Sequence, residues 1–146
     1  MAVKLSTGLG TALMGASGID TALNLGFIKI YSGAVPAGAN DSLGAATLLL
    51  TISNNSTGTG LTLGTAAGGA ISKTSGEVWS GVVVAGGTPS FYRFVAPGDT
   101  GGASTTEVRL QGTVATAGAD LNMTNNPLVV SATETVTVYN LNIPVG

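Results

Sequence analysis

One short stretch of the sequence carries residue types at a spacing that is typical of catalysis. Asp99-Thr100-Gly101 is the tripeptide that holds the catalytic carboxylate in aspartic proteases. Those enzymes keep two aspartates about 3 Å apart with one shared proton, because two carboxylates at that distance cannot both ionise. The tripeptide occurs once in this chain, so two copies of the chain would be needed to complete the pair.

The residues around Asp99 favour a turn over a protease site. A protease aspartate must follow a hydrophobic strand that buries its carboxyl group, whereas Asp99 lies in the glycine-dense segment 96–105. We expect this segment to be mobile and solvated. Aspartates in such turns accept a hydrogen bond from their own backbone, and the glycines adopt positive φ. The sequence therefore predicts a surface turn at Asp99.

The sequence lacks the residues of the common catalytic sets. It contains no histidine and no cysteine, which excludes a Ser-His-Asp triad, a thiol nucleophile and metal ligation by either residue. The acidic residues never alternate closely as in a calcium loop, and the glycines match neither a dinucleotide-binding nor a phosphate-binding loop. A pair of carboxylates brought together from separate loops stays open. We predict a protein that is not an enzyme and that uses no cofactor and no metal.

Charged residues are scarce for a chain of this length. They make up 8% of the 146 residues, and the net charge is −2, whereas soluble domains contain about 25%. The surface must therefore consist mainly of Thr, Ser, Asn, Ala and Gly, or be covered by other chains. Such a surface favours a protein that is packed in an assembly. A solitary secreted β-domain is the alternative.

The basic residues and the apolar runs argue against two classes of partner. The five Lys and Arg residues are scattered, whereas nucleic-acid binding needs them clustered. The longest apolar runs, 48–50 and 82–84, have the length of strands, and a membrane-spanning helix needs about 20 residues. We predict no nucleic-acid partner and no membrane association.

The elements that would position functional residues begin with a helical segment. Leucines recur at a spacing of four, which predicts a short amphipathic helical segment within residues 5–24, divided at Gly18. Two roles of the apolar stripe stay open: it packs on the protein's own sheet, or it contacts other subunits. The residues that form it are Leu5, Leu9 and Leu13.

After this segment the apolar period changes to two, which predicts strands. Gly86-Gly87 indicates a turn that joins two of them, 77–85 and 90–96, in a hairpin. Short strands separated by Gly- and Pro-containing loops predict an all-β fold, an antiparallel β-sandwich or barrel with a short N-terminal helical segment. We expect one domain over 1–146, with a helical arm at 1–25 and the β-domain at 26–146. The expected strands are 27–32, 47–53, 61–64, 77–85, 90–96, 107–114 and 133–143.

The aromatic residues allow two interpretations. Most are expected in the core, with an interface anchor as the alternative; this group consists of Trp79, Phe91, Tyr92 and Phe94. A carbohydrate-binding module would instead need exposed aromatic rings beside Asp or Asn. Trp79 and Tyr31 are the candidates for that role.

Several stretches resemble a family of small structural proteins from the virions of tailed bacteriophages. Together they cover most of the chain in the family's order. The last is the most specific, because Gly-Ala-Asp-Leu-Asn after a strand is not a generic effect of composition. The stretches are KLSTGL (4–9), IKIYSG (28–33) followed by Pro36, SKTSGEVWSG (72–81), FYRF (91–94) and GGASTTEVRLQGTVATAGADLNM (101–123).

The resemblance implies a head decoration (cement) protein, which binds the outer capsid surface and clamps neighbouring major capsid subunits. Tail or baseplate components of similar size are an alternative, and a host- or carbohydrate-binding β-module is another. The expected partners are the major capsid protein and further copies of this chain. A homo-oligomer, with a trimer preferred, would match the symmetry axes of a lattice. The expected location is the capsid surface of the virion, after synthesis in the host cytoplasm. The candidate assembly contacts are Leu5, Leu9, Leu13, Trp79 and Tyr31.

Overall fold

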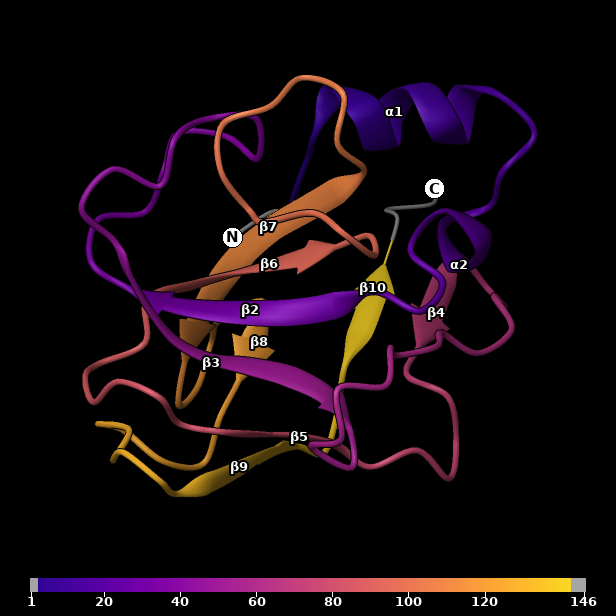
Figure 1. The fold of residues 1–146 in the computed structure, drawn as a ribbon. Helices are drawn as coiled ribbons and strands as arrows, with labels where there is room; N and C mark the ends of the chain where they lie inside the picture. Colours follow the sequence, from indigo (N-terminus) through magenta and orange to yellow (C-terminus); the bar gives the residue numbers. More distant parts are fainter. Residues whose placement is uncertain (1–2, 143–146) are drawn as a thin grey trace.

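Eight strands form one large sheet and two more form a small second sheet (Figure 1). This computed structural model describes residues 3–142, so the ends of the predicted domain, 1–2 and 143–146, lie outside the described residues. Two short helices precede the main sheet, α1 (Thr7–Met14) and α2 (Ile19–Ala22). The prediction of an all-β fold with a short N-terminal helical segment is confirmed, and the two packed sheets are consistent with a β-sandwich.

The large sheet follows the order β1-β7-β6-β2-β3-β5-β9, with β8 beside β7, and the small sheet pairs β10 with β4. From β7 to β9 this order runs from top to bottom in Figure 1. All pairs are antiparallel except β7 with β8. The strands are β1 (Lys4–Leu5), β2 (Phe27–Ser32), β3 (Thr47–Asn54), β4 (Ala70–Ser72), β5 (Trp79–Val82), β6 (Phe91–Val95), β7 (Arg109–Ala115), β8 (Leu121–Asn122), β9 (Thr133–Val136) and β10 (Asn140–Asn142).

Helix α1 begins where Ser6 caps it. The Ser6 hydroxyl accepts a hydrogen bond from the Leu9 backbone N–H at 3.0 Å, which satisfies one of the free donors of the first turn. Leu9 is fully buried in the core. Gly8 approaches the loop before β7 so closely that an added Cβ would lie 2.3 Å from the Thr106 carbonyl oxygen. Glycine in this helix therefore allows it to pack directly on the backbone of that loop.

The main core lies on one face of the large sheet and is centred on aromatic rings. The Trp79 ring lies 5.5 Å from Tyr139 and 6.0 Å from Phe94, and the hydroxyls of Tyr92 and Tyr139 are 3.0 Å apart. Burial raises the pKa of both tyrosines, so both hydroxyls stay neutral. The predicted core positions of Trp79, Tyr92 and Phe94 are confirmed.

The opposite face of the sheet is buried as well, which the sequence pattern did not indicate. The alternation in 27–32 predicts a strand with one solvated face. In the structure Tyr31 is 2% exposed, and its ring stacks on Phe91 at 5.0 Å. The loops that follow β2 and β6 lie over this face and remove it from water.

The predicted hairpin between 77–85 and 90–96 is wrong. Both edges of β5 are occupied by β3 and β9, and both edges of β6 by β2 and β7. Gly87 pairs with Leu128 instead, and two strands, β3 and β2, lie between β5 and β6. Turn residues indicate where a chain can bend, but long-range pairing decides which strand it meets.

The predicted strands 133–143 and 61–64 are also corrected. The first is divided into β9 and β10, which belong to different sheets, and its residue 143 lies outside the described residues. Tyr139, between the two strands, is 2% exposed and packs in the aromatic core. The second forms isolated bridges, from Leu61 to Gly26 and from Leu63 to Lys73.

The half-buried carboxylate of Glu77 connects the segment before β5 to the core. It accepts hydrogen bonds from the Trp79 indole N–H at 2.7 Å and from the backbone N–H and hydroxyl of Thr62 at 3.1 and 2.8 Å. Burial raises the pKa of Glu77, but these hydrogen bonds and the nearby Lys73 ammonium lower it further than burial raises it. The net result is a pKa below the ordinary value.

A lowered pKa makes part of the stability depend on pH. The contribution of Glu77 is present above the pKa of an unfolded glutamate and is lost as the pH falls through the lower pKa of the folded state. We expect the free energy of unfolding, measured by urea titration from pH 7 to pH 3, to fall more steeply in the wild type than in Glu77→Gln. Equal slopes would contradict this assignment.

Two glycines in α1 offer a matched test of how the helix packs. Gly10 has nothing within 4 Å of an added Cβ, so Gly10→Ala should stabilise the protein by up to about 1 kcal/mol through helix propensity. Gly8→Ala should destabilise it by about 1–3 kcal/mol, because the Cβ collides with backbone carbonyls. Urea denaturation of both variants measures the difference. A shift of the same sign in both would contradict the packing described here.

Candidate functional site

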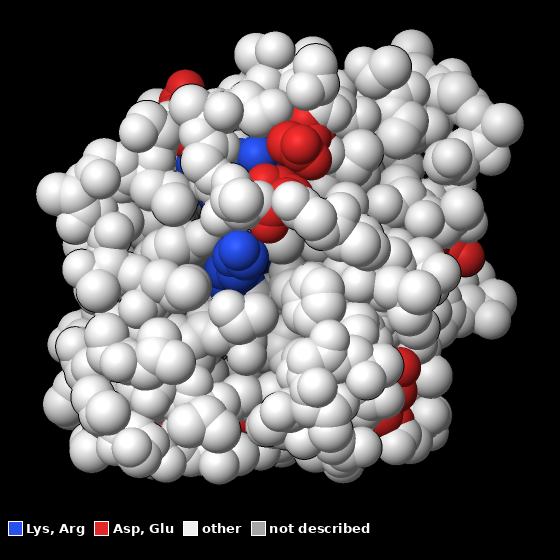
Figure 2. All heavy atoms as spheres, in the orientation of Figure 1, with Lys and Arg blue, Asp and Glu red and all other residues white. Residues whose placement is uncertain are grey.

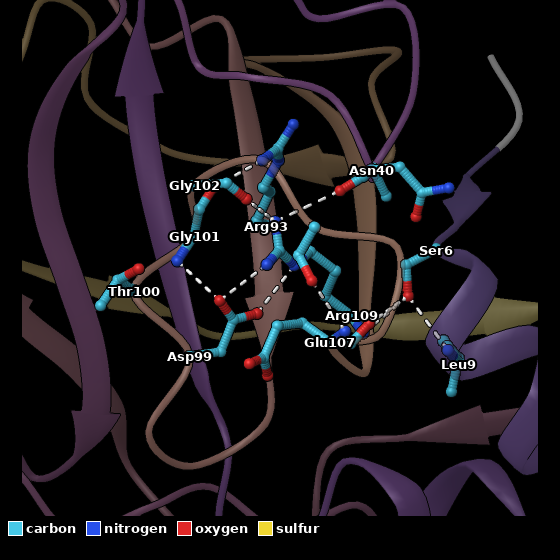
Figure 3. Close-up of polar contacts among 12 residues, drawn as sticks. Ser6, Leu9, Asn40, Arg93, Asp99, Thr100, Gly101, Gly102, Glu107 and Arg109 are labelled. Carbon is cyan, nitrogen blue, oxygen red and sulfur yellow. Dashed lines mark hydrogen bonds and ion pairs between the residues drawn. The ribbon is translucent and has the colours of Figure 1, made fainter.

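Two arginines on neighbouring strands lie beneath the loops that cover the outer face of the sheet. Arg93 is on β6 and Arg109 is on β7, and their exposed fractions are 0% and 1%. Arg93 pairs across the strands with Gln111, two residues beyond Arg109, so the three side chains lie on the same face. Figure 3 shows both guanidinium groups directed toward the loops.

Arg93 binds carbonyl groups of two separate loops. Its guanidinium donates to the carbonyls of Gly38 and Asp41 at 3.1 and 2.8 Å. It also donates to the carbonyl of Gly101 at 2.6 Å and to the side-chain oxygen of Gln111 at 3.0 Å. One buried cation therefore holds the loop after β2 against the loop after β6.

Arg109 forms the ion pair of the same cluster. Its Nε and Nη2 lie 2.7 and 2.8 Å from the two carboxylate oxygens of Asp99, and Nη1 donates to the carbonyls of Ala39 and Gly102. Asp99 also accepts from the Gly101 backbone N–H at 2.7 Å, which confirms the predicted turn. The expectation of a solvated aspartate is wrong, because the side chains of Asp99 and Arg109 are each 1% exposed.

The N-terminal segment joins the same set of loops. The Thr7 backbone N–H donates to the side-chain oxygen of Asn40 at 2.9 Å, and the side-chain amide of Asn40 donates to the Thr7 hydroxyl at 2.7 Å. Lys4 Nζ donates to the carbonyl of Ala37 at 2.6 Å. We call residues 4–7, 36–41 and 98–107, together with the arginines beneath them, the loop platform.

The electrostatics of the loop platform suit positioning rather than proton transfer. Two guanidinium groups face one carboxylate, and backbone carbonyl dipoles stabilise the remaining positive charge. Burial and then the neighbouring Arg109 lower the pKa of Arg93, which stays protonated because its ordinary value is so high. Asp99 presents both oxygens to Arg109, so its carboxylate has no place for the second aspartate of a protease pair. The cluster can hold three chain segments in one arrangement.

The structure separates the five candidate assembly contacts. Leu9, Trp79 and Tyr31 are in the interior, at 0%, 0% and 2% exposed, so they are not available to a partner. Leu13 is partly buried against the core. Leu5, at 47% exposed, is the one of the five that presents a large apolar surface.

Sequence reasoning missed the loop platform because Arg93 and Arg109 counted only as scattered basic residues. A signal was present in β6, where Arg93 lies between Phe91 and Val95 on the same face of the strand. A strand face with an apolar residue on either side of an arginine indicates that the arginine is covered. No local pattern indicates which segments cover it.

Other kinds of site have less support in the structure. Within residues 3–142, no three His, Cys, Asp or Glu side chains gather as a metal ion would require. An open groove between β8 and the segment joining β9 to β10 contains Asp120, whose carboxylate already accepts from the N–H and hydroxyl of Thr113 at 2.8 and 2.9 Å. Neither helix of the described residues is long and apolar enough to cross a membrane.

Comparisons of the chain with protein-family models, with curated proteins and with solved structures found no match. The function must therefore be argued from the residues and their arrangement.

The ion pair beneath the loop platform can be tested with two aspartates of the same region. Asp99→Asn leaves two buried guanidinium groups without a carboxylate and should lower the free energy of unfolding by about 3 kcal/mol. Asp41→Asn changes an exposed side chain and should lower it by less than about 0.5 kcal/mol. Urea denaturation at pH 7 measures both. Similar losses in the two variants would show that the buried pair contributes little.

Proposed function

We propose that this protein is a non-enzymatic structural component of a tailed-phage virion, a decoration protein that binds the outer surface of the head. It would stabilise contacts between major capsid subunits and act as a homo-oligomer. The proposal begins from the sequence resemblance, and the placement of charge in the fold carries it further.

A third of the few charges that the chain contains are buried, and three of the twelve charged side chains are largely exposed. All of them lie within residues 3–142, and the exposed surface of the described structure is 6954 Å². Figure 2 shows how few charged side chains reach one face. The buried charged residues are Arg93, Asp99, Arg109 and Glu134; the largely exposed ones are Lys4, Asp20 and Asp41.

A neutral surface supports a role in an assembly for a physical reason. Burying an unpaired charge in an interface costs several kcal/mol, so a surface with few charges can be covered over wide areas without that penalty. A decoration protein binds many equivalent places on a lattice, and modest contacts at each place add together. The rigid loop platform also supports the proposal, because pre-organised loops lose little conformational entropy on binding.

The carbohydrate-binding alternative depended on exposed aromatic rings, and its two candidate rings are buried. Trp79 and Tyr31, the candidates for exposed stacking rings, lie in the interior. The tail or baseplate alternative uses the same surface properties, so an experiment must separate it from the head.

Immunogold electron microscopy on intact virions of the phage that encodes this chain provides that experiment. Antibody raised against the purified protein should place label over the heads, because a decoration protein lies outside the capsid. Antibody pre-adsorbed with purified protein is the control and should leave the virions unlabelled. Label confined to tails would replace this proposal by the tail alternative, and unlabelled virions would contradict a role on the virion surface.

A further inference from the structure

Strand β9 forms a free edge of the large sheet. It is the last strand in the order, and within residues 3–142 its one neighbour is β5. The backbone N–H of Val83 donates to the Ala132 carbonyl at 2.9 Å, and the Val83 carbonyl accepts from the Ser131 N–H. With the register of β5 and β9, this makes Glu134 and Val136 the residues whose backbone groups bond to β5. The backbone groups of Thr133 and Thr135 therefore point away from the sheet.

The outward side chains of this edge carry no charge and no proline that would discourage pairing with another strand, and its one inward charge is held by hydrogen bonds. Natural edge strands carry outward lysines, prolines or inward charges that prevent association. Thr133 and Thr135 are exposed and uncharged. The charged residue of the strand, Glu134, is 3% exposed and accepts from the Asn125 side-chain amide at 2.9 and 3.1 Å. The edge is thus an open template of donors and acceptors.

Exposed valines adjoin the same edge. Segment 82–87 runs antiparallel to segment 128–133, as shown by the pair Val82 with Thr133 and the bridge from Gly87 to Leu128. The lower part of Figure 2, over β5 and β9, is almost free of charge. Apolar groups gathered in this way mark interaction sites. The valine patch consists of Val82, Val84, Val129 and Val130, which are 46%, 65%, 65% and 54% exposed.

We propose that a second copy of this chain occupies this surface, with the two β9 edges paired antiparallel about a two-fold axis and the two valine patches side by side. A two-fold interface sets each surface against itself, so the surface must be self-complementary. A neutral edge with alternating donors and acceptors meets that condition, because no outward charge faces its own copy. The inference rests on the homo-oligomer in the proposed function and names its contact.

Glu134 selects the register of this pairing. An axis through Glu134 would set the two carboxylates directly opposite each other, which destabilises a strand pair. An axis through Thr133 sets Thr133 opposite its own copy and brings the valine patches of both copies toward the axis. The paired ladder is then short, because residues 129–132 form a turn in which Ser131 has a φ of 70° and donates its N–H to Val83, so the valine patches supply most of this contact. A two-fold contact produces dimers, in contrast to the trimer expected by analogy with lattice symmetry.

Cysteine cross-linking tests both the contact and its register, because the chain contains no cysteine of its own. In the proposed pairing the two Thr133 Cα atoms lie about 5.5 Å apart, within the range that a disulfide spans. Thr133→Cys should therefore form a covalent dimer under mild oxidation, detected on a non-reducing gel. Thr135→Cys should not, since its two copies would be about 14 Å apart along the strands. Cross-linking of Thr135→Cys instead of Thr133→Cys would overturn the register.

Solution mass by light scattering tests the association itself. The wild type should be a dimer, and Val84→Lys should be a monomer because it places like charges across the axis. Val78→Lys is the matched control; this valine is 46% exposed immediately before β5, at the end away from the valine patch, and the variant should stay dimeric. Circular dichroism should show that both variants are folded. A wild-type monomer or trimer, or equal effects of the two variants, would overturn the inference. A monomer that still labels virion heads would overturn this inference and the homo-oligomer, but would leave the proposed role on the phage head standing.

Discussion

The buried guanidinium groups of Arg93 and Arg109 determine how the outer face of this sheet is built. A cation removed from water must be surrounded by acceptors, and the sheet itself supplies few. The acceptors come instead from the carbonyls of loops 36–41 and 98–102 and from the carboxylate of Asp99. Loops that contain many glycines, and that would otherwise be mobile, are thereby held in one arrangement.

The burial of charged residues in the interior also affects the composition of the surface. Because four of the few charged residues are buried, the exterior consists mainly of hydroxyls, amides and small apolar groups. Such an exterior does not repel a neutral partner and loses little when it is covered. The two ends of the sheet therefore differ. Near β1 the loops are held in place by buried hydrogen bonds and presented outward, whereas at β9 the outward backbone groups of Thr133 and Thr135 have no partner strand within the described part of the chain.

Much of the fold followed from local patterns, and the errors share one cause. The period of the apolar residues predicted the helix and most of the strands, since side-chain burial repeats with the geometry of each element. Pairing was less predictable, because Gly86-Gly87 indicated a turn without indicating that β3 and β9 would occupy both edges of β5. For the candidate site, the turn at Asp99 was predictable from its residues, but its burial was not, because Arg109 lies ten residues away in another element.

The sequence by itself determined the scarcity of charge, the absence of histidine and cysteine, and the all-β character, because these depend on composition and on short-range periodicity. Only the tertiary structure decided which of the few charges are hidden and which backbone edge is left open. Ion pairs and strand edges depend on contacts between segments far apart in the chain. Folding brings Asp99 to Arg109 and, within residues 3–142, leaves β9 with β5 as its one neighbour; no local pattern contains that information.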